Sequence, residues 1–144
     1  MKPTNETKKQ KVPVEIDLGH EDALPGLRIL IVEDMGLIAM ELRRVLQRAG
    51  CEIVGVASRL SEALRIVQTT ECLDGVLLDL NLSGEESYPV AEILHERGIP
   101  FIIMSGYDAS NTRADCAHEA HLQKPFTNDD LAALMRRRFQ LPQV

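Results

Sequence analysis

Five side chains in this sequence have the chemistry of a phosphate-handling site, and each follows or ends a short apolar run. They are Glu33, Asp34, Asp79, Ser105 and Lys124. Three carboxylates held close together would repel one another and raise their pKa values unless a cation lay among them. Oxygen ligands at this density suit Mg²⁺, which keeps several waters and shares its coordination shell with phosphoryl oxygens. These residue types therefore point to a magnesium site that accepts a phosphoryl group.

The chemistry assigned to such a site is aspartyl phosphorylation. With Mg²⁺ and Lys124 drawing charge from the phosphoryl oxygens, Asp79 attacks in line, and Ser105 donates a hydrogen bond to a phosphoryl oxygen. Each residue alone also fits a structural role: a solvated acid pair, an aspartate that starts a loop, a helix cap or a surface lysine. The functional interpretation is favoured because all of them fall at successive strand ends, in the order that one fold would require.

The elements that must position these residues alternate along the chain. Short apolar runs predict five strands, and helical spacing of apolar residues predicts five helices between and after them. The strands are 28–32, 52–57, 75–79, 100–104 and 121–123, and the helices are 36–49, 61–67, 88–97, 110–119 and 130–139. Right-handed crossovers place helices on both faces of a parallel sheet. We predict a doubly wound, flavodoxin-like α/β fold with strand order 2-1-3-4-5, whose strand ends open on one edge.

The first 26 residues differ from the remainder of the chain. They are polar, carry several lysines and acids, and end at the turn signal Pro25-Gly26. Such a composition predicts a flexible extension, followed by one domain over 27–144. Val14, Ile16 and Leu18 alternate with acids, so a short edge strand or docking segment remains an alternative.

Composition excludes several classes of function. The net charge of -6 argues against direct nucleic-acid binding, which needs basic residues to neutralise phosphates. No apolar run approaches the ~20 residues that span a bilayer, and no signal segment opens the chain, so we expect a cytoplasmic protein without a membrane partner. Cys51, Cys72 and Cys116 lack metal-type spacing and are interpreted as reduced, small apolar residues.

From residue 27 to about 140 the chain resembles a receiver domain of the two-component response regulators, on the strength of the strand-end residues named above. The resemblance implies that Asp79 is the phosphoacceptor and that Glu33 and Asp34 hold Mg²⁺, with the main-chain carbonyl of Asn81 as a further ligand. It also implies that Ser105 is the switch hydroxyl and that Lys124 pairs with the phosphate before a cis proline. A histidine kinase would be the donor, and no catalytic turnover is expected.

The run Pro100–Tyr107 further resembles a receiver subgroup that reads Pro-Phe-x-Phe-Ala-Thr-Gly-Tyr, with Ile103, Met104 and Ser105 replacing Phe, Ala and Thr. Such receivers often stand alone and work with sensor kinases of the HWE or a related type. His121 stands where many receivers have an aromatic switch residue. The alternatives are that His121 acts as a smaller rotor, that His121 is an exposed residue of an edge strand, or that Tyr107 acts as a gate.

The expected function is therefore a phosphorylation-dependent switch. The chain ends soon after the last predicted helix, so we expect either output through an unidentified downstream protein or a role as a phosphate sink or shuttle. Dimerisation on phosphorylation stays open. One rival is a haloacid-dehalogenase-like phosphatase, but that family has a second acid two residues after its nucleophile, where this chain has Asn81. Another rival is a pseudo-receiver, a binding module that keeps the fold without phosphorylation.

Overall fold

The computed structural model of the 144-residue chain describes residues 26–106, 113–116 and 118–139. Within them, a five-stranded sheet has the order β2-β1-β3-β6-β7, and all neighbouring strands of this sheet pair in parallel. Its strands are β1 (Arg28–Val32), β2 (Glu52–Ala57), β3 (Gly75–Asp79), β6 (Phe101–Ser105) and β7 (Ala120–Gln123). The predicted doubly wound α/β fold and its strand order 2-1-3-4-5 are confirmed, with β6 and β7 as the fourth and fifth strands.

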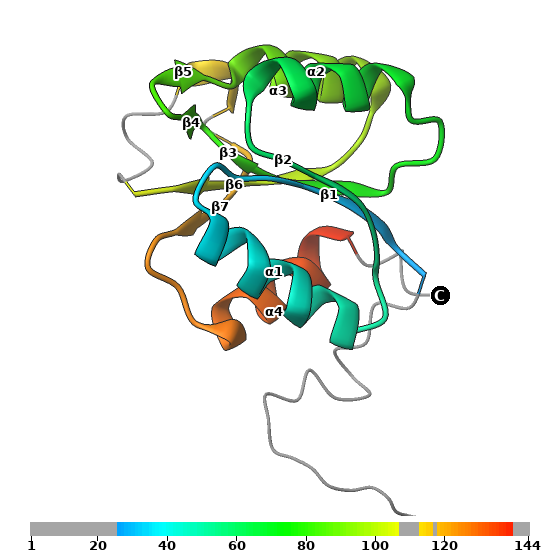
Figure 1. The fold of residues 1–144 in the computed structure, drawn as a ribbon, viewed down its shortest axis with the longest axis vertical. Coiled ribbons are helices and arrows are strands. Elements are labelled where there is room, and N and C mark those ends of the chain that lie inside the picture. The colour runs from blue at the N-terminus through cyan, green and yellow to red at the C-terminus, as the bar shows by residue number, and fades with distance from the viewer. Residues whose placement is uncertain (1–25, 107–112, 117, 140–144) are drawn as a thin grey trace, which may run out of the picture.

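Helices cover both faces of this sheet. Figure 1 shows α2 (Leu60–Thr69) and α3 (Tyr88–Arg97) on one face, and α1 (Gly36–Arg48) and α4 (Asn128–Phe139) on the other. Each crossover between parallel strands carries the chain over the sheet, which leaves the carboxyl ends of the strands open for side chains and loops.

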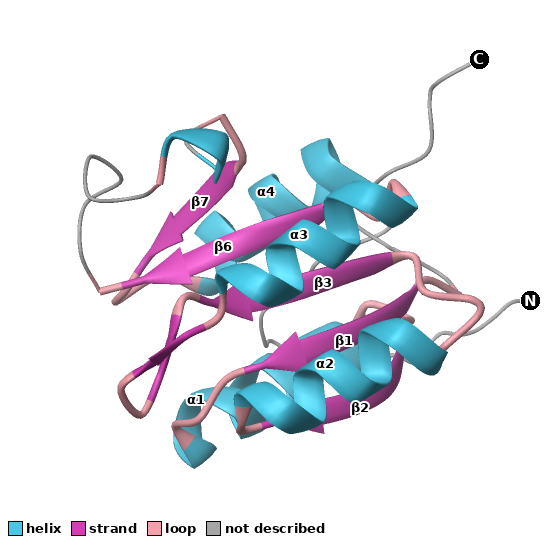
Figure 2. Cartoon of the chain, turned by 90° about the horizontal axis from the view of Figure 1, so that it is seen from above, coloured by secondary structure: helices cyan, strands magenta, loops and turns pink. Residues whose placement is uncertain are grey.

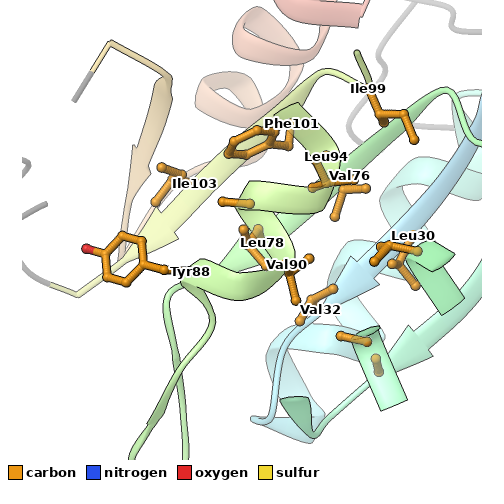
Figure 3. Close-up of a cluster of buried hydrophobic side chains, with 14 of the residues drawn as sticks. Leu30, Val32, Val76, Leu78, Tyr88, Val90, Leu94, Ile99, Phe101 and Ile103 are labelled. Carbon is orange, nitrogen blue, oxygen red and sulfur yellow. The ribbon is translucent and has the colours of Figure 1, made fainter. Parts of the chain in front are cut away.

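The sheet separates two apolar clusters, and this explains why its central strands β1, β3 and β6 are apolar over most of their length. In β1, Ile29 and Ile31 belong to the cluster beneath α1 and α4, whereas Leu30 and Val32 belong to the cluster beneath α2 and α3. Figure 3 shows part of the second cluster, where residues of α3 lie over β1, β3 and β6. Because successive strand residues point to opposite faces, a strand covered on both faces needs apolar residues at every position.

Two glycines are required by the way the elements pack. A Cβ atom on Gly75 would lie 2.7 Å from Cε1 of Phe139, so glycine lets the start of β3 pass the end of α4 without displacing that ring. Gly98 ends α3 with φ 68°, a left-handed conformation that glycine adopts without a Cβ clash.

The region between β6 and β7 differs from the prediction. A helix was expected over 110–119; residues 110–112 and 117 lie outside the described residues, and the described ones contain only a 3₁₀ turn at Ala114–Cys116. Cys116 is fully buried in the cluster beneath α2 and α3. The stretch has few apolar residues, so one buried side chain fixes a short turn without supporting a longer amphipathic helix.

A second difference follows β3. No element was predicted between the strand 75–79 and the helix 88–97, but the structure has a small antiparallel hairpin there, made by β4 (Asn81–Leu82) and β5 (Glu85–Glu86). Asn81 pairs with Glu86 and Leu82 with Glu85. The side chain of Leu82 is 1% exposed and anchors the hairpin in the core. The hairpin is therefore fixed beside the carboxyl end of β3.

Candidate functional site

The candidate site lies where the strands of the parallel sheet end. Glu33 and Asp34 directly follow β1, Asp79 is the last residue of β3, Ser105 is the last residue of β6, and Lys124 directly follows β7. Figure 2 shows the arrowheads of β1, β3 and β6 pointing to the same side of the sheet. Parallel pairing in register brings these strand ends level with one another, as the sequence predicted.

Lys124 joins two of the carboxylates. Its Nζ lies 2.8 Å from Oδ2 of Asp79, to which it donates a hydrogen bond, and 2.7 Å from Oε1 of Glu33. The contact with Glu33 is an ion pair rather than a well-directed hydrogen bond, and Oε1 of Glu33 has no hydrogen-bond partner among the described residues. The ammonium thus lies between the ends of β1 and β3.

Glu33 is the most deeply buried of the three acids, with 1% of its surface exposed. Burial raises the pKa of Glu33, and the charge of Asp79 raises it further; the contacts with Lys124 and the Met35 N–H lower it but do not cancel the burial effect. The Met35 N–H donates to Oε2 of Glu33 over 3.1 Å. A second positive charge in this site would favour the ionised form of Glu33.

For the pKa of Lys124, contacts with the acids outweigh burial, whereas for Glu33 burial outweighs the contacts. Burial alone lowers the pKa of its ammonium, but the hydrogen bond to Asp79 and the contacts with Glu33 outweigh that effect, so the pKa of Lys124 is raised. Lys124 therefore stays charged at neutral pH and is held as a fixed cation beside Asp79.

Asp34 completes the group of acids. Glu33, Asp34 and Asp79 each offer a carboxylate oxygen, and these three oxygens lie within 4.8 Å of one another. The half-buried Asp34 accepts a hydrogen bond of 2.8 Å from the hydroxyl of Ser83. Three carboxylates so close together leave a negative charge that one ammonium does not balance.

The backbone around Asp79 is held by two contacts. The Asn81 N–H donates to Oδ1 of Asp79 over 3.0 Å, and the hydroxyl of Ser87 donates to the Asp79 carbonyl over 2.5 Å. Ser87 is fully buried. The carboxylate of Asp79 is therefore oriented by Asn81 on one oxygen and by Lys124 on the other.

Ser105 lies at the end of β6, next to the strand that leads to Lys124. The Lys124 N–H donates to the Ser105 carbonyl over 2.8 Å, and the Ser105 residue is half-buried. The Lys124-Pro125 peptide bond is cis, as the family resemblance implied. This geometry fixes the backbone of both residues at the same edge of the sheet.

The two proposed switch residues have different outcomes. Tyr107 lies outside the described residues. His121 lies in β7, an edge strand of the sheet, and is partly buried rather than exposed; its Nδ1 is 3.0 Å from the Glu119 carbonyl. The role of each residue in switching remains a prediction.

Sequence reasoning did not assign functions to Ser83 and Ser87, which contact Asp34 and the Asp79 backbone. Ser87 directly precedes Tyr88-Pro89, where α3 begins, which predicts a helix cap; its hydroxyl makes no cap hydrogen bond and donates to the Asp79 carbonyl instead. No local signal exists for Ser83, since its partner is 49 residues away in the sequence.

The donor set fits a divalent cation. Three carboxylates and one ammonium carry a net charge of about -2 when all are ionised, and oxygen ligands are those that Mg²⁺ prefers. The candidate ligands are Glu33, Asp34 and Asp79; a main-chain carbonyl from Asn81 is the further ligand implied by the resemblance. The chemistry and spacing of the acids are consistent with a magnesium site.

Comparison with known proteins gives one consistent family. The sequence profile of the response regulator receiver domain matches residues 29–136. Transcriptional regulatory protein PdtaR of Mycobacterium tuberculosis is 32% identical over 114 residues, which are 76% of this chain and 55% of PdtaR. The chain spans about half the length of the curated relatives it matches.

Solved structures agree with this result. The solution structure of SdrG from Sphingomonas melonis Fr1 is similar with a TM-score of 0.69 and 39% identity, covering 76% of this chain and 93% of SdrG. The crystal structure of the response regulator PhyR from Brucella abortus has a TM-score of 0.70 and 29% identity, covering 85% of this chain and 51% of PhyR. No helix within the described ranges is long and apolar enough to cross a membrane.

Proposed function

The chain belongs to the response regulator receiver domain family, and from this membership we propose that Asp79 accepts a phosphoryl group from a histidine kinase. Members of this family are phosphoacceptor signalling modules rather than turnover enzymes. The observation that carries the proposal is the contact of Lys124 with both Asp79 and Glu33, at an edge where Asp34 supplies a third carboxylate. This arrangement is a nucleophile, a fixed cation and a set of metal ligands in one place.

In the proposed transfer, a carboxylate oxygen of Asp79 forms a bond to phosphorus while the bond from phosphorus to the imidazole nitrogen of the donor breaks. The electron pair stays with the imidazole, which takes up a proton. Lys124 balances charge on the phosphoryl oxygens, because its ammonium already lies 2.8 Å from Asp79. Mg²⁺, when bound, supplies further neutralisation of that charge.

Orientation of the nucleophile comes from the chain itself. The Asn81 N–H and Lys124 hold the two oxygens of Asp79, and Ser87 fixes the backbone carbonyl of the same residue. Such fixed geometry lowers the entropic cost of an in-line attack. After transfer, the Ser105 hydroxyl is proposed to donate a hydrogen bond to a phosphoryl oxygen, from its place at the end of β6.

The readout is proposed to follow from that new contact. Movement of Ser105 toward the phosphoryl group would alter the segment after β6 and the edge strand β7, with Tyr107 and His121 as the candidate switch residues. A downstream protein then binds the altered face. The kinase is proposed to be of the HWE or a related type, on the resemblance of the run Pro100–Tyr107.

A phosphatase of the haloacid-dehalogenase type is disfavoured by the environment of Asn81. Its side-chain Oδ1 accepts a hydrogen bond of 2.8 Å from the Gly84 N–H and so stabilises the hairpin turn. A side-chain amide in that place cannot act as a general acid, because it has no acidic proton to give to a leaving group. Incubation with small phosphate esters should therefore release no phosphate beyond the rate without protein.

The direct test is phosphorylation of the full chain by acetyl phosphate with Mg²⁺, read by intact mass. We expect an adduct of one phosphoryl group in wild type and none in Asp79→Asn. Asp129→Asn is the matched control, since Asp129 is exposed at the start of α4, and it should form the adduct normally. Absence of an adduct from acetyl phosphate and from a kinase would favour a pseudo-receiver.

A further inference from the structure

We infer that Ser83 is a positioning residue that aims Asp34 at the cation, so that the turn of the β4–β5 hairpin is part of the metal site. The inference rests on the proposed function, because it requires the acids to bind a divalent cation. Its starting observation is the hydrogen bond of 2.8 Å from the Ser83 hydroxyl to Oδ2 of Asp34. This contact ties the hairpin turn to the end of β1.

The three carboxylates can be compared by what orients them. Glu33 is held by Lys124 and by the Met35 N–H, and Asp79 is held by Lys124 and by the Asn81 N–H. For Asp34, the Ser83 hydroxyl is the hydrogen-bond partner found among the described residues. Removing that hydroxyl would leave Asp34 as the one acid of the three whose side chain no described donor fixes.

The backbone of Ser83 indicates that its side chain has a specific use. Ser83 has φ 54°, and it is the only non-glycine residue with a positive φ in the described part of the chain. Residues with a Cβ atom are disfavoured in this left-handed region, whereas glycine is not. On backbone grounds alone, glycine would suit this position better than serine. Strained conformations of this kind often mark functional positions.

The turn that presents Ser83 is well defined. The Asn81 side chain accepts the Gly84 N–H over 2.8 Å, and Leu82 is buried beneath the hairpin. Asn81 in turn donates its own N–H to Asp79. The position of the Ser83 hydroxyl is therefore set relative to Asp79, and the bond to Asp34 transmits that position to the third acid.

The hydrogen bond leaves Asp34 able to bind a cation. A carboxylate has two oxygens with about four acceptor sites, and Ser83 occupies one of them on Oδ2. A hydroxyl donor withdraws a little charge from the carboxylate, which opposes cation binding, but it also fixes the side chain in one orientation. Partners that orient a metal ligand typically change affinity about 10–100-fold when removed, so we expect orientation to dominate.

The test compares Mg²⁺ affinity, measured by calorimetric titration of the full chain, with thermal stability in the absence of metal. Ser83→Gly removes the hydroxyl and relieves the backbone, so we expect a Kd raised about tenfold together with an unchanged or higher Tm. Ser83→Ala removes the hydroxyl but keeps the unfavourable φ, so we expect weaker binding without a gain in Tm. A purely structural role for Ser83 would not separate affinity from stability in this way.

Two further variants complete the design. Ser83→Asn tolerates a left-handed backbone and carries an amide donor, so it should restore part of the lost affinity. Ser61→Ala, an exposed serine of α2, is the control and should bind Mg²⁺ as wild type does.

The outcomes are distinct. If Ser83→Gly binds Mg²⁺ as tightly as wild type, the positioning role is wrong while the proposed magnesium site stands. If Ser83→Gly binds more tightly, the hydroxyl competes with the cation, which also overturns the inference. If wild type itself shows no Mg²⁺ binding, the cation part of the proposed function fails and the role of Ser83 fails with it.

Discussion

The ammonium of Lys124 lies 2.8 Å from Oδ2 of Asp79, although 45 residues separate the two and β6 lies between their strands in the sheet. The same ammonium lies 2.7 Å from Glu33. One lysine thus bridges two buried acids at the carboxyl edge of the sheet. In the metal-free protein, Lys124 balances part of the negative charge of these two acids.

Replacement of Lys124 should destabilise the protein in the absence of metal. Lys124→Met leaves Glu33 and Asp79 without their cation; loss of one partner from a fully buried pair costs about 3–5 kcal/mol, and we expect about 2 kcal/mol here because Lys124 is partly exposed. Urea unfolding in EDTA measures the loss. Added Mg²⁺ should restore part of it, because a cation again balances the acids. An unchanged free energy of unfolding would show that the bridge does not stabilise the fold.

Glu33 should make stability depend on pH. Its pKa is raised above the ordinary value of 4.5, mainly by burial, so the folded protein holds this proton more tightly than the unfolded chain does. The resulting contribution to stability is present below pH 4.5 and is lost as the pH rises through the higher pKa of the folded state. In EDTA, wild type should lose this contribution as the pH rises, whereas Glu33→Gln should not. The free energy of unfolding of Glu33→Gln minus that of wild type should therefore increase with pH over this range. Parallel pH profiles of the two proteins would contradict the assignment to Glu33.

Substitution of Gly75 should disturb the contact between β3 and α4. In Gly75→Ala the new Cβ would lie 2.7 Å from the ring of Phe139, so the ring must move, and overpacking of this kind typically costs about 1–3 kcal/mol. Phe139→Leu in the same chain should recover part of that loss by making room. A double-mutant cycle on unfolding free energies measures the coupling. Additive effects would mean that the ring is not the source of the cost.

The three cysteines should differ in reactivity. Cys72 is exposed, while Cys51 and Cys116 are buried, and burial raises the pKa of the Cys51 thiol from 9.0 to about 11. Since the thiolate is the reactive form, a thiol reagent at pH 8 should label Cys72 rapidly and the other two only as the protein unfolds. Cys72→Ser should remove the rapid phase. Rapid labelling that persists in this variant would contradict the burial of the other two. All three cysteines are free, in agreement with their interpretation as reduced residues; Cys51 and Cys116 are buried, whereas Cys72 is exposed.

Much of the fold could be predicted because its signals are local. The predicted strands 28–32 and 52–57 coincide with β1 and β2. Continuous apolar runs predict buried strands, whereas apolar residues spaced three and four apart predict helices, so the two can be told apart along the chain. Helix ends agree within one or two residues, as for α1, where Gly50 marks the end. The expected helix over 110–119 is not found in the described residues, because a single burial site at Cys116 favours a short turn.

The sequence by itself determined which residue types end each strand, and through the strand order it determined that Glu33, Asp34, Asp79, Ser105 and Lys124 gather at one edge. Those inferences need only side-chain periodicity and the handedness of crossovers. Only the tertiary structure decided that Lys124 pairs with both Asp79 and Glu33 and that Ser83 holds Asp34. Asp79 and Lys124 are 45 positions apart in the sequence, and Glu33 and Lys124 are 91 positions apart. The geometry of these contacts therefore depends on how separate strands and turns pack. No local pattern records which donor will orient which acid.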